Sequence, residues 1–299
     1  MDSKSCNAED AMVQEQREDD MPDSLKREIA DVKMRAQAIK GEHRELDARL
    51  YTPAGKPAEG MIIYFPGGGF VKDELEMSDI FVRVLAARSG YIVLASSYTL
   101  ASEKPFPSAA EDAHAVLAWA GRFSKRKGWK QARLIVAGLE AGGNLAAVAT
   151  LMARDRGGPA LAAQILMMPM LDPGLSSCSM RTVAAANGGM GAAYACAQSY
   201  RGYLPHAIDR AHPYASPLQS SRTKGLPPAL ILSADDDPLR DEAEQYGAKL
   251  LASGVATTMR RLPPIALDVP DARCCCARQG NVLDEITAFI AGLNAQQNT

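Results

Sequence analysis

The chain has 299 residues, a net charge of -2 and 47% hydrophobic residues, which suffices for one large α/β domain with a full core. The near-neutral charge argues against nucleic-acid binding, so we expect a small-molecule partner. No apolar stretch approaches the roughly 20 residues that cross a bilayer, the start of the chain lacks a leader pattern, and the cysteines lack paired CxxC spacing. We therefore expect a cytoplasmic protein with reduced thiols, no metal and no cofactor.

The first elements predicted along the chain are a tail and a helix. Residues 1–22 are polar and mostly acidic, which indicates a disordered acidic tail. From about residue 24 to Lys40, apolar residues near helical spacing predict a charged surface helix.

Short apolar runs then alternate with helical patterns. Strands are predicted at 44–51, 61–65, 91–95, 133–137, 163–167, 229–233 and 257–262, and helices at 77–88, 108–122, 141–154 and 239–253. This alternation predicts an α/β fold with a mainly parallel central sheet and helices on both faces. A ligand is then expected at the carboxyl ends of the strands.

The segment 134–148 reads as a hydrophobic strand, a glycine-framed turn and a helix of small residues. Gly138 and Gly142 stand where the glycines of a G-x-S-x-G nucleophile elbow stand, but Glu140 takes the place of the serine. A carboxylate cannot attack an ester as an activated serine alkoxide does.

Three further motifs accompany the elbow in a fixed order. They are the Gly67–Gly69 run after an apolar strand, the stretch 97–107, and the Asp-Pro-Leu-Arg-Asp-Glu sequence at 237–242. Together the four motifs resemble the hormone-sensitive-lipase-like (fold-3) branch of the α/β-hydrolase superfamily, from about residue 24 to the C-terminus with an interruption near 263–280. The resemblance implies a single α/β-hydrolase domain over 23–299, with a small helical cap formed by 23–43 and 173–212.

The resemblance also implies roles for particular residues. The amides of Gly68, Gly69 and Ala141 correspond to the oxyanion hole, and Asp237 corresponds to the acid of the catalytic triad. We expect the ligand pocket to include Phe70, Tyr98, Met190 and Tyr194, because aromatic and methionine side chains suit an apolar ligand.

The chain departs from the family pattern at the catalytic base. Pro66 stands where relatives usually have a histidine before the glycine run, and Leu267 falls at or beside the position of the catalytic histidine. The departure is concentrated in 263–280, and one hypothesis is a compensated local shift of the reading frame. Such a shift would not explain Glu140 or Pro66.

These departures lead us to expect a degenerate triad and a non-hydrolytic pseudo-hydrolase that binds a small apolar molecule, such as an ester, lactone or acyl compound, or a protein partner. In that reading Glu140 fills the oxyanion hole. Two alternatives stay open: a lyase, isomerase or cyclase with Glu140 as general base and Asp237 as second carboxylate, and a residual carboxylesterase. A homodimer is also left open.

Overall fold

The computed structural model describes residues 22–55, 60–129, 133–182, 189–265, 267, 272–277 and 279–296. Within these residues one sheet of eight strands has the order β1-β2-β4-β3-β5-β6-β7-β8. The strands are β1 (Lys33–Lys40), β2 (Glu45–Thr52), β3 (Gly60–Phe65), β4 (Ile92–Ser96), β5 (Arg133–Leu139), β6 (Ala163–Met167), β7 (Ala229–Ala234) and β8 (Thr257–Leu262). The predicted tail over 1–22 lies, except for Pro22, outside the described residues.

One strand of this sheet, β2, runs opposite to the other seven. β1 pairs antiparallel with β2, and β2 pairs antiparallel with β4. All pairings from β4 through β3, β5, β6 and β7 to β8 are parallel. The mainly parallel sheet predicted from alternating strands and helices is therefore confirmed, and the carboxyl ends of its parallel strands share one edge.

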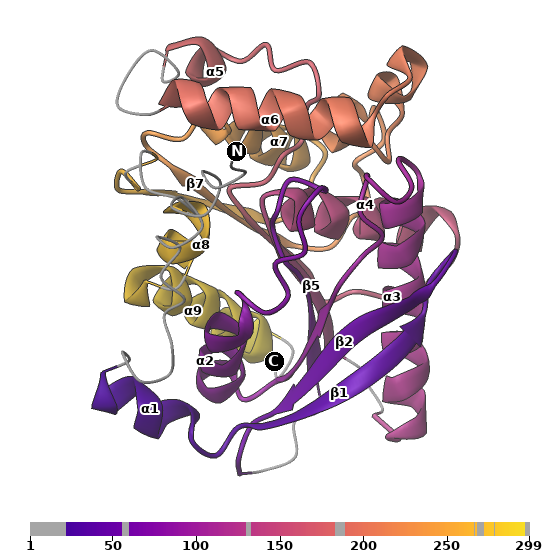
Figure 1. The fold of residues 1–299 in the computed structure, drawn as a ribbon. Helices are drawn as coiled ribbons and strands as arrows, with labels where there is room; N and C mark the ends of the chain where they lie inside the picture. Colours follow the sequence, from indigo (N-terminus) through magenta and orange to yellow (C-terminus); the bar gives the residue numbers. More distant parts are fainter. Residues whose placement is uncertain are drawn as a thin grey trace, which may run out of the picture.

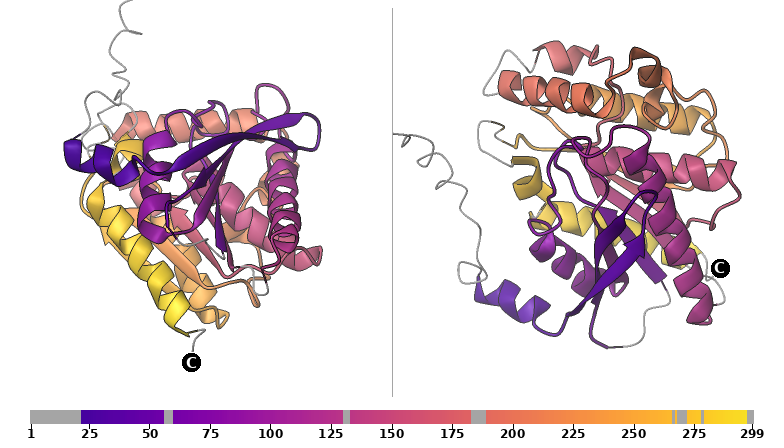
Figure 2. Two further views of the ribbon diagram at one scale, coloured as in Figure 1. Left: turned by 90° about the horizontal axis from the view of Figure 1, so that it is seen from below. Right: turned by 45° about the vertical axis from the view of Figure 1, so that its right-hand side comes forward.

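Helices cover both faces of the sheet, as Figures 1 and 2 show. One face packs against α3, α4 and α7, and the other against α2 and α9. Successive residues of the central strand β5 alternate between the two cores: Leu134 and Val136 belong to one, Ile135 and Ala137 to the other. The helices are α1 (Asp23–Ile29), α2 (Asp79–Ser89), α3 (Ser108–Arg126), α4 (Ala141–Asp155), α5 (Cys178–Thr182), α6 (Gly189–Tyr203), α7 (Arg240–Ala252), α8 (Ala272–Ala277) and α9 (Gly280–Gln296), with short 3-10 turns η3 (Ala207–Ala211) and η4 (Pro217–Gln219).

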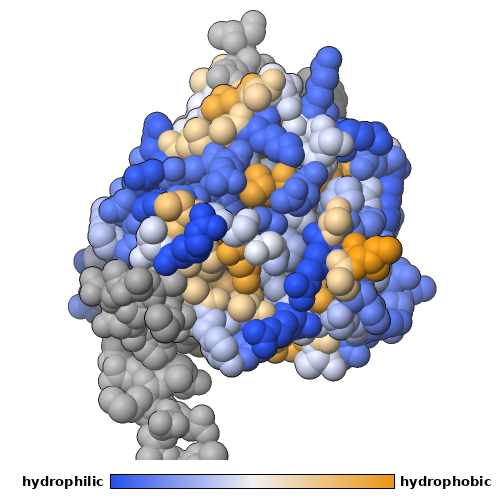
Figure 3. Space-filling view, turned by 90° about the horizontal axis from the view of Figure 1, so that it is seen from above, coloured by the Kyte–Doolittle hydropathy of each residue, from blue (hydrophilic) through white to orange (hydrophobic). Residues whose placement is uncertain are grey.

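The insertion predicted at 173–212 lies over the carboxyl edge of the sheet. It contains α5, α6 and η3, and α6 runs across the top of the molecule in Figure 1. Seen from above, this end carries hydrophilic side chains interspersed with small hydrophobic patches (Figure 3). None of the helices within the described ranges combines the length and apolar character needed to span a bilayer.

The predicted helix from residue 24 to Lys40 is wrong beyond Ile29. The structure has the short helix α1 followed by β1, which pairs with β2 along its whole length. Lys, Met, Arg, Ala and Gln favour helices locally, but the ladder of hydrogen bonds to β2 outweighs that preference. α1 contacts α2 and lies at the end of the molecule away from α6 (Figure 1). Residues 23–43 therefore do not lie over the site with residues 173–212, where the cap was expected.

Candidate functional site

Glu140 occupies a sharp turn between β5 and α4. Its backbone has φ 53° and ψ -111°, a left-handed conformation that is rare for residues other than glycine. A Cβ at Gly138 would overlap the Gly142 carbonyl, and a Cβ at Gly142 would overlap the Phe65 carbonyl. The two glycines are therefore required by close backbone packing, and the turn keeps the geometry of a nucleophile elbow.

The Glu140 carboxylate lies against the glycine loop that follows β3. The Gly68 amide donates to Oε2 of Glu140 at 3.1 Å. The loop is braced from behind by Tyr98, whose hydroxyl donates to the Gly67 carbonyl. Burial raises the pKa of this phenol well above its usual value, and the nearby carboxylates of Glu74 and Glu140 raise it further, so Tyr98 remains a donor.

Asp237 follows β7 and is completely buried. Its Oδ1 accepts from the Leu239 amide at 2.9 Å, which fixes the side chain at the start of the turn into α7. Arg273 of α8 pairs with it through two hydrogen bonds, Nε to Oδ2 at 2.7 Å and Nη2 to Oδ1 at 2.8 Å. This is the bidentate geometry of a strong guanidinium–carboxylate pair.

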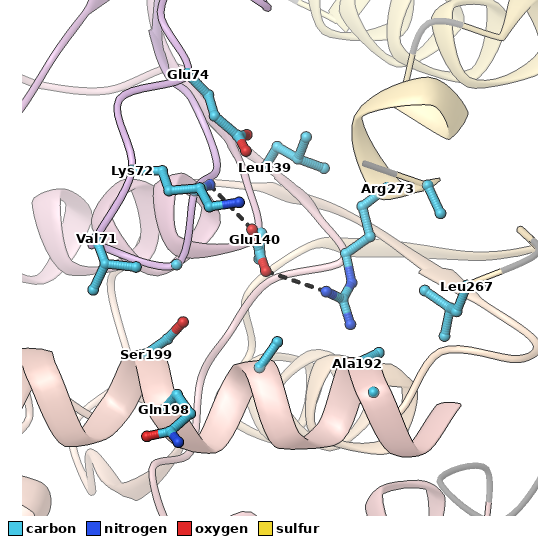
Figure 4. A pocket seen from close by; sticks show the side chains of 15 residues that line it. Val71, Lys72, Glu74, Leu139, Glu140, Ala192, Gln198, Ser199, Leu267 and Arg273 are labelled. Carbon is cyan, nitrogen blue, oxygen red and sulfur yellow. Dashed lines mark hydrogen bonds and ion pairs between the residues drawn. The ribbon is translucent and has the colours of Figure 1, made fainter. Parts of the chain in front are cut away.

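Arg273 also joins Asp237 to Glu140. Its Nη1 lies 3.1 Å from Oε1 of Glu140, so one guanidinium bridges both carboxylates (Figure 4). Burial by itself lowers the pKa of Arg273, but the charge and hydrogen bonds of Asp237 and the charge of Glu140 raise it well above its usual value. Arg273 is therefore a permanent cation at this site, where a triad histidine would exchange protons.

A pocket of about 500 Å³ opens beside Glu140. Its walls come from the glycine loop, the elbow, α6 and the stretch around α8, with polar and apolar side chains mixed (Figure 4). The described lining residues are Gly68, Gly69, Val71, Lys72, Glu74, Leu139, Glu140, Gly191, Ala192, Ala195, Gln198, Ser199, Leu267, Ala272 and Arg273.

Some of the residues expected in the pocket lie elsewhere. Phe70 is fully buried and stacks on Tyr203 with ring centroids 3.8 Å apart. Tyr98 points behind the glycine loop, and Tyr194 is 61% exposed on the outer side of α6. These three predictions are wrong because the side chains face away from the cavity, whereas the side chain of Met190 lies outside the described residues.

Arg273, which was not predicted from the sequence, lies where the catalytic histidine of the family was expected. Leu267, placed there by its distance from Asp237, lies in the pocket wall, while Arg273 sits between Asp237 and residue 140. None of the histidines of the chain is in the described pocket lining; His206 and His212, for example, are exposed around η3. The sequence could have indicated a residue like Arg273 only indirectly, because a carboxylate buried at position 237 requires a nearby cation.

The elbow, the glycine loop beside it and the buried acid after β7 define the architecture of an α/β hydrolase. The sequence matches the family model of the alpha/beta hydrolase fold over residues 62–266, so the chain belongs to this family, in its hormone-sensitive-lipase-like branch. The resemblance drawn from four motifs is thereby confirmed. The matched region ends inside the interrupted stretch 263–280, which supplies Arg273.

Several relatives of this chain are named as esterases. The chain is 36% identical over 231 residues to the carboxylic ester hydrolase LipN of Mycobacterium tuberculosis, covering 75% of this chain but only 61% of LipN. It is 32% identical to an arylesterase of Saccharolobus solfataricus, covering 76% of this chain and 74% of that protein. The structure of a hyperthermophilic esterase of Pyrobaculum calidifontis superimposes with a TM-score of 0.79 at 30% identity, covering 92% and 90% of the two chains.

These comparisons overturn the expectation of a non-hydrolytic pseudo-hydrolase. Relatives at 30–36% identity over most of the chain are named esterases, which favours a hydrolase. The expectation was wrong because it gave the exchanged residue at position 140 more weight than the retained framework around it. The alternative of a residual carboxylesterase fits these findings better.

Proposed function

We propose that the protein is a slow carboxylic ester hydrolase that acts on small esters. The observation that carries the proposal is the position of the Glu140 carboxylate: it lies on the glycine loop, is held by Arg273 and borders the pocket. A base, a row of backbone amides and a cavity thus meet at one point, which is what ester hydrolysis requires.

The amides of Gly69 and Ala141 are the proposed donors to the oxyanion that develops on the ester carbonyl. Each preorganised donor of this kind contributes a factor of about 10² to 10³ to kcat. Arg273 adds a fixed positive charge beside them, and it needs no proton exchange to stabilise the developing charge.

Glu140 is the proposed general base. Its carboxylate takes the proton from the attacking oxygen as that oxygen bonds to the ester carbonyl carbon, and returns a proton to the leaving alkoxide. Arg273 and the Gly68 amide hold the two carboxylate oxygens, so the base is oriented before substrate binds. General-base assistance of this kind contributes a factor of about 10² to 10⁴.

The pocket favours short substrates. Its volume of about 500 Å³ lies in the range of ordinary small-molecule sites. Val71, Leu139 and Leu267 offer apolar contacts for an acyl chain, and Gln198 on α6 offers an amide to a polar group. Short acyl esters, including lactones, are therefore the proposed substrates.

The test is hydrolysis of p-nitrophenyl acetate and butyrate by the wild type and Glu140→Gln, which removes the base but keeps the shape. We expect release of p-nitrophenol above the buffer rate, and a loss of about 10²- to 10⁴-fold in kcat/KM in the variant. Glu285→Gln, on α9 and paired with Arg260 at the surface, is the matched control and should hydrolyse as the wild type does. Equal rates for wild type and Glu140→Gln would exclude this mechanism.

A further inference from the structure

The described pocket lining contains a single hydroxyl group, that of Ser199 on α6. The residue is 8% exposed, and it lies in the wall of the pocket. In Figure 4 its side chain points from α6 into the space that Glu140 faces. A largely buried hydroxyl in a pocket wall is available to a molecule bound there.

Ser199 packs directly on the glycine loop. A Cβ at Gly69 would overlap the Ser199 hydroxyl, so a side chain at 69 would displace it. The Glu140 carboxylate rests on the adjoining Gly68 amide. The Ser199 hydroxyl and the Glu140 carboxylate therefore pack against two consecutive glycines of this loop, Gly69 and Gly68.

We propose that Ser199 is the catalytic nucleophile of the ester hydrolysis, with Glu140 as its base; this rests on the proposed function. In an ordinary triad a serine is the nucleophile and a histidine is its base. Here the serine on α6 would be the nucleophile, and the carboxylate at the elbow would be its base. Position 140 then supplies the base, and the nucleophile comes from the helix on the opposite wall of the pocket.

The reaction has two steps. In the first, Oγ of Ser199 bonds to the ester carbonyl carbon while its proton passes to Glu140, and the bond to the alkoxy group breaks as that proton moves to the departing oxygen. In the second, water attacks the acyl-Ser199 ester, Glu140 takes a proton from the water and returns it to Oγ, and the acid is released. The net reaction is ester plus water giving acid plus alcohol.

Covalent labelling tests the nucleophile without ester turnover. The full chain is treated with a fluorophosphonate, its intact mass is measured, and the modified peptide is sequenced. We expect one adduct, on Ser199, that is absent from Ser199→Ala and slowed in Glu140→Gln. Ser89→Ala, a serine on α2 whose hydroxyl donates to Leu85, should label as the wild type does. An adduct on any other residue overturns the proposal.

Rapid-mixing kinetics with p-nitrophenyl acetate give a second readout. We expect a burst of one p-nitrophenol per chain, lost in Ser199→Ala, and retained in Ser199→Cys because a thiol can also form the acyl intermediate. Circular dichroism checks that each variant is folded. Hydrolysis that requires Glu140 but is unchanged in Ser199→Ala overturns Ser199 as nucleophile and leaves the proposed function intact. Labelling of Ser199 without ester turnover shows a reactive hydroxyl, but it overturns both the proposed function and the role of Ser199 in ester hydrolysis.

Discussion

Arg273 donates to both carboxylate oxygens of Asp237, and Asp237 has no exposure to solvent. The same guanidinium also pairs with Glu140, so the one positive charge of Arg273 is shared by two carboxylates. Removal of the cation leaves a buried charge without compensation, which is the costly way to break such a pair.

We therefore expect Arg273→Met to lower the free energy of unfolding by about 3 to 5 kcal/mol, measured by urea denaturation. Adding Asp237→Asn should recover most of the loss, because the uncompensated charge is then gone. Arg261→Met, which breaks a half-exposed pair with Glu244, should have little effect. If the single Arg273 variant is as stable as the wild type, the bridge does not stabilise the fold.

A second prediction concerns the return of a serine to the elbow. Glu140→Ser alone should gain no esterase activity, because the guanidinium of Arg273 cannot accept a proton from it. Glu140→Ser with Arg273→His places an imidazole beside Asp237 and should raise kcat/KM over the single variant by about 10²- to 10⁴-fold. Glu140→Ala with Arg273→His is the control that lacks the hydroxyl, and activity equal to that of the serine double variant would refute a relay.

A third prediction concerns the turn glycines. Gly142→Ala should destabilise or prevent folding, because its Cβ would overlap the Phe65 carbonyl at the end of β3. Gly292→Ala, on α9 with open space around it, should instead stabilise the protein by roughly 0.5 to 1 kcal/mol through helix propensity. Thermal unfolding of the two variants compares them, and equal melting temperatures would contradict the close approach at Gly142.

A fourth prediction concerns Glu242, a buried carboxyl on α7. Burial raises its pKa well above the usual value; the Leu171 amide, which donates at 2.7 Å, opposes this, and the nearby charges of Asp172 and Asp237 add to it. The folded protein thus holds this proton more tightly than the unfolded chain does. The free energy of unfolding should fall as pH rises from the ordinary carboxyl range towards the raised pKa.

Glu242→Gln should remove this pH dependence of the free energy of unfolding, while its amide oxygen still accepts from Leu171. The variant should therefore become increasingly more stable than the wild type as pH rises. Urea denaturation at pH 5, 7 and 9 measures the difference. Glu244→Gln is a control of opposite sign, because the hydrogen bond from Arg261 lowers the pKa of Glu244 and its contribution is lost only as pH falls. A constant difference between Glu242→Gln and wild type across pH would contradict the buried proton.

Most of the parallel strands were predictable because they are short apolar runs bounded by turn residues, as Ile62 to Tyr64 of β3 are. The edge strand β1 was not, because only Ile39 in it is buried, so its pairing with β2 leaves almost no hydrophobic pattern to read. Edge strands with one apolar contact are fixed by backbone hydrogen bonds, which side chains do not encode.

The site was predictable where backbone geometry dictates residue type, and hidden where it depends on long-range contacts. Gly138 and Gly142 identify the elbow because no other residue fits there. Arg273 reaches Asp237 across 36 positions of chain, from a segment without the family pattern. Ser199 was likewise unreadable, because only the placement of α6 over Gly69 gives its hydroxyl a function to propose.

The left-handed backbone at Glu140 is fixed by its surroundings rather than by its side chain. The Glu140 amide donates to the Met167 carbonyl, and its own carbonyl accepts from Met170, so strand and loop clamp the peptide on both sides. The backbone conformation at position 140 therefore does not depend on which side chain stands there, so different side chains can occupy the turn without a change in the surrounding structure. A change in one codon can therefore replace the reactive group at position 140. Gly138 and Gly142, in contrast, cannot be replaced without a clash with neighbouring backbone carbonyls.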